Sequence, residues 1–90
     1  MAGFVGMDVE AVEGIGRQLK SKSGEIESLI QAIQGLVGQA EASWKGKDST
    51  EFKNWWDSQH KPALLRLKEA IDGLGQSALN NATEQRSVSN

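Results

Sequence analysis

Apolar residues recur every three or four positions along the first half of the chain, which is the spacing of one face of an α-helix. The series begins at Val12 and continues through Ile15, Leu19, Ile26, Leu29, Ile33, Leu36 and Ala40, with Lys22 in place of one apolar residue. Asp8 precedes the series, and aspartate is a favourable residue at a helix N-terminus. We therefore predict a first helix over about residues 8–44 with a heptad pattern.

A second apolar row, made of Ile30, Val37 and Trp44, lies beside this series in the later half of the helix. A helix with one neighbour needs only a narrow apolar face, whereas a wider face indicates that the helix is covered from two sides. We therefore predict that Ile30 and Val37 face a second chain.

Lys45, Gly46 and Lys47 interrupt the pattern and predict a turn over 45–47. Asp48 and Glu51 then have the spacing of a capping box at the start of a second helix, over about 48–82. Its expected inward positions are Phe52, Trp56, His60, Ala63, Leu64, Leu67, Ala70, Ile71, Leu74 and Ala78. Pro62 lacks a backbone N–H and predicts a kink. The polar residues 83–90 predict a flexible tail.

No alternating β-branched pattern competes with these helices, so the predicted fold is an all-α antiparallel two-helix hairpin. Each helix of about 35 residues would be about 50 Å long. Such a hairpin buries only the residues between its helices, so we predict pairing into a four-helix-bundle dimer. The predicted dimer interface is Ile30, Val37, Leu64 and Ile71. The alternative is a monomer that folds back at Pro62 into a three-helix bundle.

The first helix also contains five glycines, at positions 14, 16, 24, 35 and 38. Each glycine costs up to roughly 1 kcal/mol relative to alanine in a helix interior. Packing rather than intrinsic propensity must therefore stabilise this helix. Either the small residues let two helices approach closely or they are merely tolerated, and the sequence leaves both explanations open.

The composition excludes several classes of function. Ninety residues form a single domain, 1–90, and the chain has no cysteine and one histidine. A net charge of −2 without a basic cluster disfavours nucleic-acid binding, and no apolar run approaches the roughly 20 residues of a membrane span. The polar faces are not rich in Lys and Arg, which disfavours contact with a membrane surface. The first residues lack the pattern of a conventional signal peptide.

Nothing in the sequence predicts an enzyme. His60 has no serine or carboxylate placed by a motif to complete a catalytic triad. The carboxylates are dispersed along solvated faces rather than clustered as a metal site requires. We therefore predict no catalytic residue, no metal and no cofactor, and we interpret His60 as a polar interruption of a helix interface.

All three tryptophans lie between positions 41 and 56, around the predicted turn. Trp56 is in line with the apolar face, so we expect it in the core. Trp55 is one position further round and should face outward, where an exposed indole indicates a partner. Trp44 is expected to be partly buried with one edge available, and Gly46 can adopt positive φ at low cost. These positions predict a recognition surface at the tip of the hairpin.

The Trp44-Lys45-Gly46 turn between two heptad helices of equal length resembles the WXG family of small secreted proteins. These are substrates of the type VII (ESX) secretion systems of actinobacteria and firmicutes. The resemblance covers nearly the whole chain. It includes the Gly-Met-Asp-Val start of the first helix, and Asp48 with Phe52 after the turn.

The resemblance implies that the protein pairs with another WXG-like chain, as a homodimer or a heterodimer. It implies export of the folded pair from the cytoplasm, without a cleaved signal peptide, by a type VII export ATPase. In the family the turn and the tail of the partner chain together form the export signal. The turn half maps onto Trp44 and Gly46, and we add Trp55 as a candidate recognition residue.

The tail departs from the family pattern. The family signal is Tyr-x-x-x-Asp/Glu, whereas this chain has no tyrosine and Asn80 stands four residues before Glu84. Either a partner chain supplies the tail signal, or this is a homodimeric branch with a different tail, or the chain helps export a larger protein. The predicted function is an effector or export partner acting by protein–protein contact. The alternative is an intracellular helical chaperone or toxin-binding module.

Overall fold

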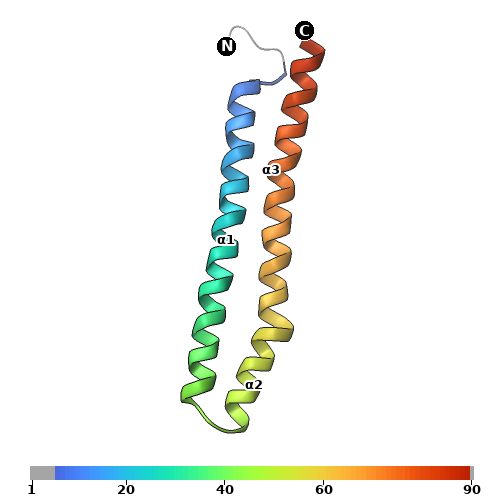
Figure 1. Cartoon of the computed structure of the whole chain (residues 1–90). Helices are drawn as coiled ribbons and strands as arrows, with labels where there is room; N and C mark the ends of the chain where they lie inside the picture. Colours follow the sequence, from blue (N-terminus) through green and yellow to red (C-terminus); the bar gives the residue numbers. More distant parts are fainter. Residues whose placement is uncertain (1–5, 90) are drawn as a thin grey trace.

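The computed structural model describes residues 6–89 and consists of two long helical arms that run antiparallel side by side (Figure 1). The first arm is α1 (Val9–Ser43), and the second comprises α2 (Lys47–Trp55), the π-helical turn η1 (Trp56–His60) and α3 (Lys61–Ser89). The molecule measures 65 × 17 × 17 Å, and its radius of gyration is 19.8 Å. A compact chain of this length would have a radius of gyration of about 12 Å. The predicted all-α hairpin is confirmed, and the alternative of a three-helix bundle is wrong.

Both ends of α1 lie within one residue of the predicted limits. Asp8 caps the helix, because its Oδ1 accepts a hydrogen bond of 3.1 Å from the backbone N–H of Ala11. The second arm begins at Lys47 with Gly46 at the cap position, where no side chain caps the helix. Asp48 therefore lies in the first turn of α2. Its carboxylate interacts favourably with the positive end of the helix dipole there, but it does not cap the helix.

Two rows of α1 side chains, each repeating every seven residues, face the second arm. The inner row is buried and consists of Gly16, Ser23, Ile30 and Val37. The middle row is half-buried and consists of Val12, Leu19, Ile26, Ile33 and Ala40. Near the turn, Ile30 and Val37 pack with Trp56 as the buried core of the hairpin. The inner row has large side chains near the turn but glycine and serine near the open end. The two arms therefore enclose bulky apolar side chains at the turn and lie closer together at the open end.

The narrow end depends on a close approach of the two backbones at Gly16 and Gly75. A Cβ atom on Gly75 would lie 2.8 Å from the carbonyl oxygen of Gly16, and one on Gly16 would lie 2.9 Å from Cγ of Leu79. The other helical glycines, at positions 14, 24, 35, 38 and 73, have no such neighbour within 4 Å. Close approach of the helices therefore explains Gly16 and Gly75, whereas the other helical glycines are merely tolerated.

The π-helical turn changes which residues of the second arm face α1. At its end the N–H of Lys61 bonds to the carbonyl of Trp56, five residues earlier, just before Pro62, which has no N–H to donate. The turn inserts one residue, so the facing positions move by one from those predicted. Gly75 and Ala82 are buried and Lys61 and Lys68 are half-buried, whereas His60, Leu67 and Leu74 are exposed. The predicted inward positions His60, Ala63, Leu67, Ala70 and Leu74 were therefore wrong by one residue, whereas Leu64, Ile71 and Ala78 are half-buried as predicted.

The second arm also continues past the predicted limit of residue 82. The residues predicted as a flexible tail are helical as far as Ser89, where α3 ends, and Asn90 lies outside the described residues. Ala82 is fully buried against α1, and Arg86 forms an ion pair of 2.7 Å with Glu13. These contacts between the arms stabilise a segment whose composition alone does not favour a helix.

Candidate interaction site

The turn between α1 and α2 requires glycine at position 46. Gly46 has φ +111° and ψ −170°, a conformation that residues with a Cβ atom very rarely adopt. Its carbonyl accepts the backbone N–H of Thr50 at 3.3 Å and so begins the helical hydrogen bonds of α2. The prediction that Gly46 adopts positive φ is confirmed, and this structural role is sufficient to explain the residue.

Trp44 and Phe52 form an aromatic pair across the turn. Their ring centroids lie 5.4 Å apart at an interplanar angle of 50°. This tilted arrangement is favourable for aromatic rings. Trp44 nevertheless remains 42% exposed, as expected for a side chain that is partly buried and has one edge available.

Trp55 and Trp56 are neighbours in sequence but lie in opposite environments. Trp56 is 6% exposed, and its indole N–H donates a hydrogen bond of 2.9 Å to Oε1 of Gln34. Trp55 is 61% exposed and lies against His60, with ring centroids 5.0 Å apart. The predictions of an inward Trp56 and an outward Trp55 are confirmed. Trp55 therefore keeps most of its indole in solvent.

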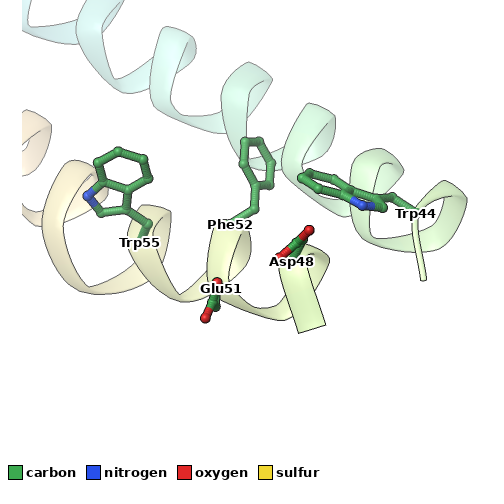
Figure 2. A pocket seen from close by; sticks show the side chains of 5 residues that line it. All are labelled: Trp44, Asp48, Glu51, Phe52 and Trp55. Carbon is green, nitrogen blue, oxygen red and sulfur yellow. The ribbon is translucent and has the colours of Figure 1, made fainter. Parts of the chain in front are cut away.

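An apolar groove at the tip of the hairpin brings these side chains together. Trp44, Asp48, Glu51, Phe52 and Trp55 line it, and its volume is about 400 Å³. Figure 2 shows the three aromatic side chains along one side of the groove, with Asp48 beside Trp44 and Phe52 and with Glu51 directed away from the rings. The sequence had indicated Trp44 and Trp55 as recognition residues but not Phe52 or the two acids, which it assigned to packing and capping.

The structure corrects the predicted dimer interface. Ile30 is only 1% exposed and Val37 is also buried, so both pack inside a single hairpin and neither is free to contact a second chain. Leu64 and Ile71 are half-buried between the arms. The prediction was wrong for Ile30 and Val37 because the middle row of α1 has an apolar row on each side of it. The sequence pattern does not say which of these two rows is buried against α3.

The apolar side chains left exposed form two outer rows. The outer row of α1 consists of Ile15, Lys22, Leu29 and Leu36, and that of the second arm consists of His60, Leu67, Leu74, Asn81 and Val88. Their large apolar members are all between 49% and 76% exposed. The heptad pattern predicts most of these residues inside the hairpin, and that prediction is wrong for the exposed ones.

A polar row on the other side of α1 shows that both outer rows lie on one side of the hairpin. This row consists of Glu13, Lys20, Glu27 and Gln34, one position after the middle row, whereas the outer row lies three positions after it. One position is a rotation of about 100° and three positions are about 60° the other way, so the polar and outer rows flank the middle row on opposite sides.

The polar row contacts the second arm along the length of the rod. Glu13 pairs with Arg86 at 2.7 Å, Lys20 with Asp72 at 3.5 Å and Glu27 with Lys68 at 3.6 Å. Asp72 and Arg86 occupy the equivalent positions of α3, one after the row that contains Leu64 and Ile71. Because the polar edges of the two antiparallel arms meet on one side, their outer rows share the other side.

The ion pairs at this polar edge are largely accessible to solvent. A hydrogen bond from Gln31, together with the charge of Lys68, lowers the pKa of Glu27 and favours its ionised form. Exposed pairs of this kind each contribute about 0–1 kcal/mol, so they fix the register of the arms more than they stabilise them. We therefore regard the opposite face, with its outer rows and the tip groove, as the candidate interaction site.

Two further features bear on function. Within residues 6–89, His, Asp and Glu side chains form no group of three or more that could hold a metal ion. None of the helices in this part of the chain combines the length and apolar composition that a membrane span needs.

Comparison with known proteins assigns the chain to a family. A comparison with curated protein sequences found no match. The structure is similar to a crystal structure of EsxA from Geobacillus thermodenitrificans (crystal form I), with a TM-score of 0.81 and 22% sequence identity over 99% of this chain and 95% of that chain. At this identity the similarity establishes a shared fold. The family model described as proteins of 100 residues with WXG matches residues 5–88. The chain therefore belongs to the WXG100 family of helical-hairpin proteins.

Proposed function

We propose that this protein is a type VII (ESX) secretion substrate that leaves the cytoplasm folded and paired with a second WXG-like chain. Membership of the WXG100 family over residues 5–88 carries this proposal. Outside the cell the pair would act by protein–protein contact, as an effector or as the export partner of another chain. The proposed route uses no cleaved signal peptide.

The exposed outer rows support pairing. Leu29, Leu36 and Leu67 are each at least 49% exposed on a rod that is 17 Å thick. A contiguous apolar face of this length is rare on a monomeric protein and typical of a contact surface. We therefore place the interface on the outer rows, with the half-buried Leu64 and Ile71 beside it, in place of Ile30 and Val37.

Pairing can be tested with two substitutions on this face. We expect Leu29→Ser combined with Leu67→Ser to weaken association about 10-fold to 100-fold, because two partly buried leucines would leave the interface. The measurement is sedimentation of the purified chain, alone and co-expressed with small Trp-x-Gly chains from the same genome. Ala42→Ser, an exposed change on the side of α1 that faces away from both the second arm and the outer row, is the control. A double variant that still pairs like the wild type would contradict the assignment of this face.

The turn supports a role in export. The resemblance places half of the family's export signal on Trp44 and Gly46, and Trp55 lies nearby in the tip groove. Because the chain has no tyrosine for the tail half of the signal, we propose that a different partner chain supplies it. This favours a heterodimer.

Export can be tested in the native host. We expect the intact wild-type chain in the culture medium only when the type VII ATPase is present, and a several-fold lower secreted fraction for Trp44→Ala and Trp55→Ala. Gln39→Ala, an exposed change near the tip, is the control, and circular dichroism checks that each variant is folded. Normal secretion without the ATPase would refute the type VII route. A chain that pairs but stays inside the cell would support the alternative, an intracellular chaperone or toxin-binding module.

A further inference from the structure

The tip groove has the chemistry of a site for a cationic side chain. Three aromatic rings line it, from Trp44 at the end of α1 and from Phe52 and Trp55 on α2. Aromatic faces carry negative electrostatic potential and attract cations that lie over them. The volume of about 400 Å³ is within the range of sites that bind small molecules or a few side chains.

Two carboxylates in the same groove add charge of the same sign. Within residues 6–89 Asp48 forms no ion pair, and Glu51 meets only the highly exposed Lys47 at 4.0 Å. Lys53, the next lysine along α2, is held by Asp57 at 2.6 Å, and this hydrogen bond raises the pKa of Lys53. The cations near the tip therefore leave Asp48 available to a ligand. In Figure 2 its side chain lies beside the rings of Trp44 and Phe52.

We propose that the tip groove binds an arginine of a partner protein, together with an apolar residue next to that arginine. A planar guanidinium can stack on an indole while it donates two hydrogen bonds to one carboxylate. The compact and strongly hydrated ammonium of lysine matches this pairing of ring and carboxylate less well. The neighbouring apolar residue would cover the exposed face of Trp55, which is 61% exposed.

A second copy of this chain does not supply such a segment from its apolar face. The outer rows contain one Lys or Arg, Lys22, and it already pairs with Glu25 at 3.2 Å. Arg86 is directed to the polar edge, where it pairs with Glu13. Charge complementarity therefore points to a partner of different sequence. This inference deepens the proposed function and rests on it, because it names the chemistry that the tip recognises.

The test is an NMR titration of the full ¹⁵N-labelled chain that follows the three indole N–H signals. The probe is a capped five-residue peptide of alternating leucine and arginine, and the matched peptides carry lysine or glutamate in place of arginine. We expect the arginine peptide to shift the signals of Trp44 and Trp55. The signal of Trp56 should stay in place, because that indole is buried and bonded to Gln34.

Variants identify the groups that hold the probe. Asp48→Asn with Glu51→Gln should weaken binding of the arginine peptide about threefold to tenfold, because the contact with Asp48 and the nearby negative charge of Glu51 are both lost. Trp55→Ala should weaken it to a similar extent. Glu10→Gln with Glu84→Gln removes the same net charge from exposed positions far from the groove and should leave the affinity within about twofold.

Several results would overturn the inference. The first is equal binding of the glutamate peptide, or unchanged affinity after loss of Asp48 and Glu51. In the second, the Trp44 and Trp55 signals move with protein concentration alone, so that a second copy fills the groove. In the third, they move on addition of phosphatidylglycerol vesicles and not with peptide. Intact peptide binding without export would refute only the proposed function, and normal export without peptide binding would refute only this inference.

Discussion

Replacing Gly75 with alanine is expected to destabilise the hairpin by about 1–3 kcal/mol, even though alanine is the better helix former. The new Cβ atom would lie 2.8 Å from the carbonyl oxygen of Gly16 and 3.1 Å from the backbone nitrogen of Lys20. Both neighbours belong to the backbone of α1, so the contact is relieved only if the arms move apart. Separation of the arms would weaken packing along the narrow end of the hairpin.

Gly73 provides a matched control on the same helix. A Cβ atom at Gly73 has no neighbour within 4 Å, so Gly73→Ala should stabilise the protein by up to about 1 kcal/mol through helix propensity alone. The measurement is urea unfolding followed by far-UV circular dichroism, with all variants at one protein concentration because association would add to the apparent stability. Equal stability of the two alanine variants would mean that the backbones do not approach closely at Gly75.

Replacing Ile30 with alanine is expected to cost about 2–5 kcal/mol in the free energy of unfolding. Ile30 is 1% exposed and packs in the core with Val37 and Trp56, so truncation would leave a cavity that the two arms cannot easily close. Because this contact lies within one chain, the loss should not depend on protein concentration. The measurement is urea unfolding at two concentrations that differ about 100-fold.

The adjacent residue tests the opposite expectation. Leu29 is 53% exposed in the hairpin, so Leu29→Ala should cost less than about 1 kcal/mol at low concentration, where single chains predominate. At high concentration its effect should grow, since the leucine is expected to be buried only in the paired state. If Ile30→Ala showed the concentration dependence instead, the inner and outer rows would be reversed and the originally predicted interface would be correct.

Local signals in the sequence were sufficient for the helices and the turn. The apolar spacing and the Asp8 cap predicted α1 to within one residue at each end. The glycine at position 46 predicted the break, because the backbone there needs a φ of +111°. One residue of helix rotation separates Trp55 from Trp56, and this was enough to predict which indole is exposed and which is buried.

The register of the second arm was not predictable in the same way. A heptad pattern assumes a uniform helix, whereas η1 inserts one residue between Trp56 and His60. Pro62 indicated an irregularity but not its form, since a kink and a π-helical turn both accommodate a missing N–H. The shift exposes Leu67 and Leu74 and directs Gly75 towards α1. The tip groove was likewise only partly predicted. Asp48 and Glu51 have the spacing of a capping box, and this role at the start of a helix explained them without a binding site.

The sequence by itself determined that this protein is two amphipathic helices joined at a glycine turn, because helix periodicity, caps and backbone freedom are local properties. Only the tertiary structure decided which face of each helix is buried by the other. Ile30 and Leu29 belong to alternative heptad faces of similar apolar character, and the choice between them depends on how closely the backbones approach at Gly16 and Gly75. The helical state of residues 83–89 was decided in the same way, by burial of Ala82 and the pair between Arg86 and Glu13. These contacts join residues far apart in the chain, so no local pattern contains them.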